Sequence, residues 1–253
     1  MIDIHSHILP GLDDGAKSMV DSLAMLKIAA ESGTTDIVAT PHANSTYNFA
    51  PNLIDRKISE LQAASPTPRI HRGCDFHLTV ENIEDALAHP AKYTINGKGY
   101  LLVEFSESLI PKTTDDIFDR LQGAGLIPVI THPERNAILK SRTDLLRSWV
   151  GNKCLVQITA QSLLGRFGRT ARSFAVQLFQ QDLVHFVASD AHDTKHRPPA
   201  LKDAYEYVAK TWGEERAQTV FVTAPGAAIL GEPFDADQSQ KVRAGRKWYF
   251  FGR

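Results

Sequence analysis

Short apolar segments alternate with longer amphipathic segments along most of the 253-residue chain. Most of the short segments are rich in Val, Ile and Leu and are bounded by polar or glycine-containing turns, which is typical of buried β-strands. They predict seven strands, at residues 2–5, 36–39, 69–74, 100–104, 127–131, 155–158 and 185–188. Because strands that alternate with helices are joined by right-handed crossovers, the pattern predicts a parallel sheet.

The amphipathic segments between these strands predict helices. Ser18 is a suitable N-cap for a helix that continues to residue 30, and Gly33 is a suitable end signal. Apolar residues spaced by three or four positions predict further helices around residues 54–61, 117–121, 145–149 and 174–179. A single α/β barrel needs about 250 residues, so the length favours one barrel domain, although the pattern alone also allows an open sheet.

Composition narrows the class of protein. Lys and Arg number 28 against 29 Asp and Glu, so the balance gives no general attraction for nucleic acid or acidic lipid. The two cysteines form no disulfide framework, and no apolar run is long enough to span a membrane. The N-terminus lacks the basic and apolar regions of a signal peptide. We therefore expect a cytoplasmic protein without a nucleic-acid partner or stable membrane insertion, and homo-oligomerisation stays open.

The C-terminus departs from the rest of the chain. Residues 235–240 are polar, and residues 241–253 mix Lys and Arg with Trp, Tyr and Phe. We predict a catalytic domain at residues 1–234 and a basic and aromatic tail at residues 235–253. The favoured interpretation is a tail that packs on its own domain or on a neighbouring subunit. The alternative is a docking segment for a partner or a membrane surface.

Candidate chemistry gathers at the predicted strand ends, where functional residues of a parallel α/β barrel lie. Five of the ten histidines fall there, and carboxylates occupy most of the remaining ends. The i, i+2 spacing of His5 and His7 places both imidazoles on one face of an extended strand. The candidate set is His5, His7, His42, Asp75, Glu104, His132, Asp190 and His192, with Asp14 from the loop after the first strand.

A single histidine at a strand end is usually a structural or surface residue. Burying nine such polar groups together without a purpose would be costly, and a metal relieves that cost directly. Imidazole and carboxylate are ligands of Zn, Mn and Fe, so the sequence predicts a metal-dependent hydrolase. His77 and His196 lie near candidate residues without obvious ligand geometry, and we expect them at most to support a ligand or touch a substrate.

Several motifs resemble those of the polymerase-and-histidinol-phosphatase (PHP) superfamily. These are DIHSH at residues 3–7, DDG at residues 13–15 and TPH at residues 40–42. HPERN at residues 132–136 and SDAH at residues 189–192, followed by RPP at residues 197–199, narrow the match. Together they resemble the bacterial PHP-type protein tyrosine phosphatases of capsular and exopolysaccharide clusters. The similarity covers residues 1–233 and does not include the tail.

This resemblance implies a distorted (β/α)7 TIM-like barrel of the PHP type that holds three divalent metals, with Mn favoured over Fe or Zn. By resemblance, the first metal takes His5, His7, Asp75 and Asp190; the second takes Asp75, Glu104 and His132; the third takes Asp14, His42 and His192. Arg135 and Arg197 match the family's phosphate-binding arginines. One position departs from the family, which usually has Glu where this chain has Asp75. The shorter side chain can loosen or shift the second metal.

The implied activity is hydrolysis of phosphotyrosine, with the tail of a bacterial tyrosine autokinase that controls capsule or exopolysaccharide synthesis as the expected substrate. A cysteine-based phosphatase is excluded because residues 80 and 160, six positions after the two cysteines, are Val and Ala rather than Arg. Two alternatives stay open: a small-molecule phosphomonoesterase acting on a substrate such as histidinol phosphate, and a catalytically silent metal-binding regulator of the kinase. A nuclease is disfavoured because the chain lacks a basic stripe.

Overall fold

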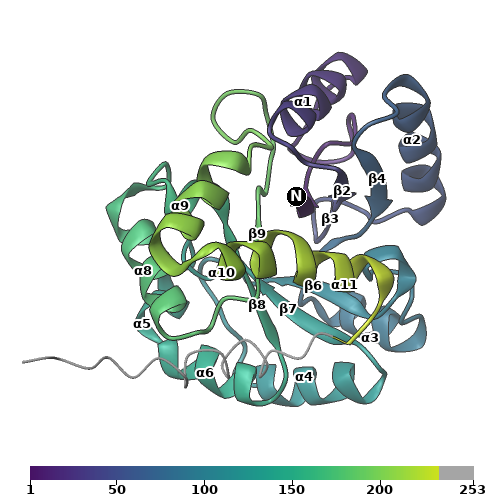
Figure 1. Ribbon diagram of the computed structural model, residues 1–253. Coiled ribbons are helices and arrows are strands. Elements are labelled where there is room, and N and C mark those ends of the chain that lie inside the picture. The colour runs from purple at the N-terminus through teal and green to yellow at the C-terminus, as the bar shows by residue number, and fades with distance from the viewer. Residues whose placement is uncertain (234–253) are drawn as a thin grey trace, which may run out of the picture.

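Two parallel sheets form the centre of the computed structural model, which describes residues 1–233 (Figure 1). The three-stranded sheet has the order β1 (Ile2–Ser6), β2 (Asp36–Ala39), β4 (Arg69–Arg72). The six-stranded sheet has the order β3 (His42–Ala43), β5 (Asp75–His77), β6 (Tyr100–Glu104), β7 (Ile127–Thr131), β8 (Leu155–Thr159), β9 (Phe186–Ala188). The prediction of a mixed α/β fold with parallel strands is confirmed. The predicted tail at residues 235–253 lies outside the described residues.

Two chain segments each contribute a strand to both sheets. The strand predicted at residues 36–39 is β2, and a further short strand, β3, begins at His42. The strand predicted at residues 69–74 stops at Arg72, and the chain resumes as β5 at Asp75. β2 pairs with β4, whereas β3 pairs with β5. Gly73 lies between β4 and β5, and a Cβ at this position would approach Val38 Cγ1 to 2.7 Å. A glycine is therefore required where the chain passes from one sheet to the other.

The two sheets also meet between the first and last strands. Ser6 and Ala191 form an isolated parallel bridge, with hydrogen bonds from His7 N to Ala191 O (2.8 Å) and from Asp190 N to His5 O (2.9 Å). This contact is much shorter than a strand ladder. Closure into a barrel is not confirmed, because strand pairing within residues 1–233 gives two sheets rather than one closed ring.

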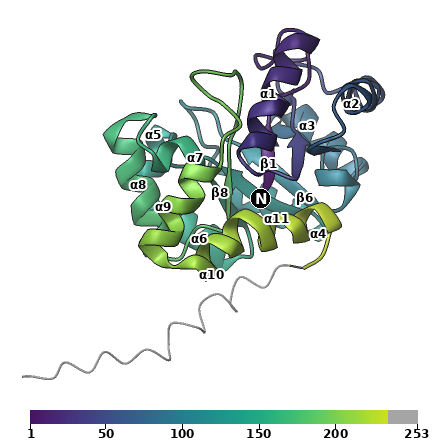
Figure 2. The ribbon, with the colours of Figure 1, turned by 45° about the horizontal axis from the view of Figure 1, so that its top comes forward.

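Helices surround the strands in both views (Figures 1 and 2). The predicted helices are α1 (Met19–Glu31), α2 (Pro51–Ala64), α4 (Thr114–Gly123), α6 (Thr143–Gly151) and α8 (Gly168–Gln180). Helices that the sequence analysis did not assign are α3 (Val80–Ala88), α5 (Ala137–Ser141), α7 (Ala160–Leu163), α9 (Lys202–Trp212), α10 (Glu214–Gln218) and α11 (Ala224–Leu230). Ser18 caps α1 as expected and accepts a hydrogen bond from Asp21 N. Within residues 1–233, no helix has both the length and the apolar character that crossing a membrane requires.

The buried apolar residues form two clusters, one on each side of the strands. The larger cluster lies between the strands and the surrounding helices. The smaller cluster consists mainly of side chains on the opposite face of the strands and includes residues of both sheets, such as Ile4, Val38, Leu102 and Phe186. Ala228 of α11 also belongs to it. The alternating direction of side chains along a strand separates the two clusters. Residues from both sheets therefore share one apolar centre, and the polar strand ends lie beyond it.

Candidate metal centre

The nine predicted ligands lie together at the carboxyl ends of the strands and in the loops that follow them. Together with His77, they provide potential ligand atoms in four overlapping groups, and within each group all atoms lie within 4.8 Å of one another. The groups are His7, Asp14, His42 and His192; His42, Asp75, His77 and Glu104; His5, His7 and Asp75; and His5, His132 and Asp190. Parallel strands place these residues together because their carboxyl ends share one edge of each sheet.

The spacing of the donor atoms fits a shared cation. His5 Nε2 lies 3.4 Å from both Asp75 Oδ2 and Asp190 Oδ1, and 3.3 Å from His7 Nε2. His132 Nε2 lies 3.4 Å from a carboxylate oxygen of Glu104. With metal–ligand bonds of about 2.0–2.2 Å, ligand atoms around one tetrahedral ion lie roughly 3.3–3.6 Å apart. These separations are longer than good hydrogen bonds and match the spacing of donors that point at a common centre.

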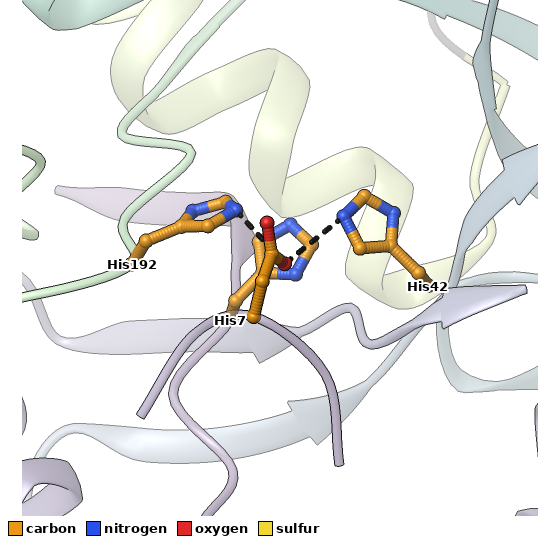
Figure 3. A group of neighbouring side chains, drawn as sticks. His7, His42 and His192 are labelled. Atoms are coloured by element: carbon orange, nitrogen blue, oxygen red, sulfur yellow. Dashed lines mark ion pairs between the residues drawn. The ribbon is translucent and has the colours of Figure 1, made fainter. Parts of the chain in front are cut away.

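The loop at residues 13–15 delivers one carboxylate to the centre. Asp14 Oδ1 lies 3.3 Å from His42 Nε2 and 3.4 Å from His192 Nε2, and Figure 3 shows these two imidazoles converging with that of His7. A Cβ at Gly15 would lie 2.1 Å from His7 O, so only glycine lets the loop run this close to the strand. Ala16 N donates to His7 O (3.0 Å) and fixes the loop there.

Two further residues orient the imidazoles of β1 and its extension. Asp13 Oδ2 lies 2.7 Å from His7 Nδ1, and Gln157 Oε1 lies 2.9 Å from His5 Nδ1. With Nδ1–H donated to these oxygens, Nε2 of each ring is left as the acceptor that faces the centre. Hydrogen bonds of this kind fix the tautomer and raise the basicity of a histidine ligand.

His132 directly follows β7, Asp190 lies two residues after the end of β9, and both have left-handed backbone angles, with φ of +32° and +49°. Non-glycine residues seldom adopt this conformation, which costs about 1–3 kcal/mol, and such strain concentrates at functional sites. Glu134, which is buried, anchors the loop after β7 by accepting hydrogen bonds from Thr159 N (2.9 Å) and Ser162 Oγ (2.7 Å).

The two predicted phosphate-binding arginines meet at one atom. Arg135 Nη1 and Arg197 Nη2 both contact Asp190 Oδ2, the oxygen that faces away from His5. The Arg135 guanidinium also lies over the Phe167 ring, 4.5 Å from its centroid, which holds the plane of the guanidinium. Both arginine side chains are 23% exposed, so each is partly accessible to solvent.

Charge is concentrated in this buried centre. Burial would raise the pKa of Asp190, but His5, His7 and Arg197 outweigh it and hold the pKa well below its usual value. Burial would also raise the pKa of Asp75, but His5 and His42 outweigh it and hold the pKa well below its usual value. Burial would lower the pKa of His7, but the Asp13 carboxylate raises it to about 9. Burial next to the Asp75 carboxylate raises the pKa of Glu104. The protonation of each carboxylate and imidazole therefore depends on the charge of its neighbours, as expected for ligands of a common cation.

Several buried nitrogen and oxygen atoms here make no hydrogen bond. These are both carboxylate oxygens of Asp75, Nδ1 of His42 and Nε2 of His77. A buried carboxylate that accepts no hydrogen bond is costly, and a metal cation among Asp75, His5 and His42 would offset that cost. The residues present therefore fit a divalent metal both in chemistry and in spacing.

The structure differs in one respect from the grouping implied by resemblance. Asp75 and Glu104 share a group with His42 and His77, whereas His132 shares one with His5 and Asp190. Sequence reasoning did not assign His77, although its i, i+2 relation to Asp75 was a usable signal. Asp13 was recognisable beside Asp14, but Gln157 lies within a strand and carries no distinctive sequence signal. His196 lies apart from these groups, with an 89% exposed side chain.

Comparison with known proteins gives a consistent result. The family described as capsular polysaccharide synthesis, CpsB/CapC, matches residues 1–230. The putative tyrosine-protein phosphatase CapC of Staphylococcus aureus is 39% identical over 210 residues, which cover 81% of this chain and 82% of CapC. The tyrosine-protein phosphatase YwqE of Bacillus subtilis is 36% identical over 220 residues, covering 85% and 86% of the two chains.

The fold is likewise similar to known structures. A chain from the crystal structures of YwqE from Bacillus subtilis and CpsB from Streptococcus pneumoniae, described as unique metal-dependent tyrosine phosphatases, superposes with a TM-score of 0.87. It is 33% identical, and the match covers 93% of this chain and 96% of that one. The lactonase Lmo2620 from Listeria monocytogenes, at 12% identity and a TM-score of 0.57, shares the fold alone.

Proposed function

The chain belongs to the capsular polysaccharide synthesis family CpsB/CapC, and from that membership we propose that it is a metal-dependent tyrosine phosphatase. The observation that carries the proposal is the cluster of buried imidazoles and carboxylates beside two partly exposed arginines. The proposed substrate is the phosphotyrosyl tail of a bacterial tyrosine autokinase. The proposed location of the phosphatase is the cytoplasm. This substrate accords with the capsule-synthesis family.

We assign three divalent metals to the centre, with Mn as the preferred ion. The first is held by His5, His7, Asp75 and Asp190; the second by Asp75, Glu104 and His132; the third by Asp14, His42 and His192. Parts of this division have support in the donor groups: Asp14, His42 and His192 lie in one group, and His5, His7 and Asp75 lie in another. For the second metal, the support is the 3.4 Å separation between His132 Nε2 and a Glu104 oxygen. The carboxylate donors suit Mn, and the imidazole donors also suit Fe and Zn.

We also infer that the strands form a distorted (β/α)7 barrel within a domain of residues 1–234. Counting β2 with β3 and β4 with β5 as one strand each gives seven strands, and strands of both sheets contribute to one inner apolar cluster. The Ser6–Ala191 bridge joins the first and last of them. This arrangement supports a barrel whose seam lies at the candidate metal centre.

Metals bound here supply Lewis-acid polarisation of a phosphoryl oxygen and a lowered pKa for water. The chain's own residues bind and orient the substrate. Arg135 and Arg197 offer planar donors to the phosphoryl oxygens, and their charge stabilises the transition state. Phe167 keeps the Arg135 guanidinium in plane. The leaving phenolate has a pKa of about 10, so its departure needs less help from a general acid than that of an alkoxide.

The test is phosphate release from a phosphotyrosine peptide by purified protein, first with EDTA and then with added Mn²⁺. We expect EDTA to abolish the activity and Mn²⁺ to restore it. Faster turnover of histidinol phosphate than of the peptide would instead establish a small-molecule phosphatase. Metal binding without release of phosphate from either substrate would establish a silent regulator.

A further inference from the structure

His77 occupies a position from which it can join the centre. It lies two residues after Asp75 on β5, so both side chains project from the same face of the strand. In the parallel ladder between β5 and β6, His77 is paired with Glu104. The backbone therefore sets the His77 imidazole beside the Glu104 carboxylate and on the same side as Asp75.

The side-chain contacts agree with this placement. His77 Nε2 is buried, and its contact is with Glu104 Oε2. His42 Nδ1 lies 3.5 Å from the same Glu104 oxygen and 3.2 Å from Asp75 Oδ2. Asp75 is fully buried, and neither of its carboxylate oxygens accepts a hydrogen bond. Potential metal-ligand atoms of four residues thus converge within 4.8 Å of one another.

The position of Asp75 leaves the Glu104 side of the centre short of ligands. Asp75 Oδ2 contacts His5 at 3.4 Å and His42 at 3.2 Å, so its short side chain stays near β1 and β3. His132 contacts Glu104 but groups with His5 and Asp190. A metal at Glu104 therefore needs a further donor on the β5 side, where His77 Nε2 lies.

Building on the proposed function, we propose that His77 is a direct ligand, through Nε2, of the divalent metal that Glu104 holds. The centre then has ten protein ligands, and the additional imidazole compensates for the limited reach of Asp75. A metal bound between Glu104 and His77 replaces their direct contact. The rival explanation is that His77 only donates a hydrogen bond to Glu104.

Three variants separate these explanations: His77→Ala, His77→Gln and, as a control, His89→Ala. Gln keeps a hydrogen-bond donor for Glu104 but lacks an imidazole nitrogen, and His89 is a 67% exposed histidine beyond the centre. The readouts are Mn²⁺ content, Mn²⁺ affinity by competition with a chelator, and the visible spectrum of Co²⁺-substituted protein. Thermal unfolding of each metal-free variant reports whether it folds.

We expect both His77 variants to bind one metal at least 10–100-fold more weakly and to change the Co²⁺ spectrum. Loss of a residue that only supports a ligand already lowers metal affinity by about 10–100-fold, and loss of the ligand itself should lower it at least as much. His89→Ala should match the wild type. Wild-type metal affinity in His77→Ala, or in His77→Gln alone, would overturn the proposal. Wild-type protein that binds metal but releases no phosphate from a phosphotyrosine peptide would refute the proposed function instead.

Discussion

The hydrogen bond from His7 to Asp13 allows a quantitative prediction for Asp13→Asn. The Asp13 side chain is 1% exposed and accepts three hydrogen bonds: from Gly15 N (3.0 Å) on Oδ1, and from His7 Nδ1 (2.7 Å) and His42 N (3.3 Å) on Oδ2. Asparagine has only one acceptor oxygen. Whichever way the amide turns, its NH2 group faces a donor. When that group faces His7, the imidazole proton moves to Nε2, the nitrogen that we propose as the metal ligand.

Two independent estimates give the same magnitude. A hydrogen bond to a charged group is worth about 1.5–3 kcal/mol. Loss of the carboxylate that supports a histidine ligand typically costs 10–100-fold in metal affinity, or about 1.4–2.7 kcal/mol. We therefore expect Asp13→Asn to raise the Kd for Mn²⁺ at the His7 site by 10–100-fold. Much of the lost activity should return at high Mn²⁺, because the ligand itself is still present.

The assay is Mn²⁺ competition with a fluorescent chelator at pH 7.5, together with kcat/KM measured as a function of Mn²⁺ concentration. Asp203→Asn is a matched control, because Asp203 lies exposed in the first turn of α9. It should leave both quantities unchanged. If Asp13→Asn binds Mn²⁺ with wild-type affinity while His7→Ala does not, control of the tautomer by Asp13 is refuted.

Four further predictions concern the same centre. His132→Ala should abolish metal-dependent turnover of a phosphotyrosine peptide, and retention of full kcat would remove His132 from the centre. Arg135→Lys should lower kcat/KM by roughly 10²–10³-fold with unchanged Mn²⁺ content, because lysine keeps the charge beside Asp190 but loses the planar fork; an unchanged kcat/KM would contradict this role. Removal of Mn²⁺ that was present at 100 times the Kd of a site should lower Tm by about 5–11 °C for each such site. Calorimetry with and without EDTA measures this change, and an unchanged Tm would argue that the folded protein does not bind Mn²⁺. Apparent Mn²⁺ affinity should rise about 100-fold from pH 6.5 to 8.5, because metal binding must displace a proton from His7, whose pKa in the metal-free protein is about 9; titration calorimetry showing a flat profile would contradict it.

Much of the strand pattern was accessible from the sequence because it depends on local properties. Buried parallel strands require continuous apolar runs, and capping residues mark helix ends, as at Ser18. The division of two chain segments between the sheets was not predicted, because it depends on packing between chain segments. Gly73 is an example, since the close approach of Val38 becomes apparent only in three dimensions. Closure of the ring is likewise a long-range property.

The candidate ligands were predictable because the fold places strand ends together. Nothing in the sequence specifies which donors share an ion. That depends on side-chain length and on the register between strands, as the pairing of His77 with Glu104 illustrates. The orienting role of Gln157 was not predictable either, since it follows from contact with a residue 152 positions away in the chain.

The bridge between Ser6 and Ala191 has a consequence for biosynthesis. Of the strands within residues 1–233, β1 is synthesised first and β9 last. The candidate centre nevertheless combines His5 and His7, from β1 and the residues after it, with Asp190 and His192, which follow β9. A nascent chain that ends before residue 190 lacks part of two of the four donor groups, because one contains Asp190 and the other contains His192. The proposed metal sites can therefore be completed only after synthesis has passed residue 192. Metal bound there would join the first strand of the domain to the loop that follows β9.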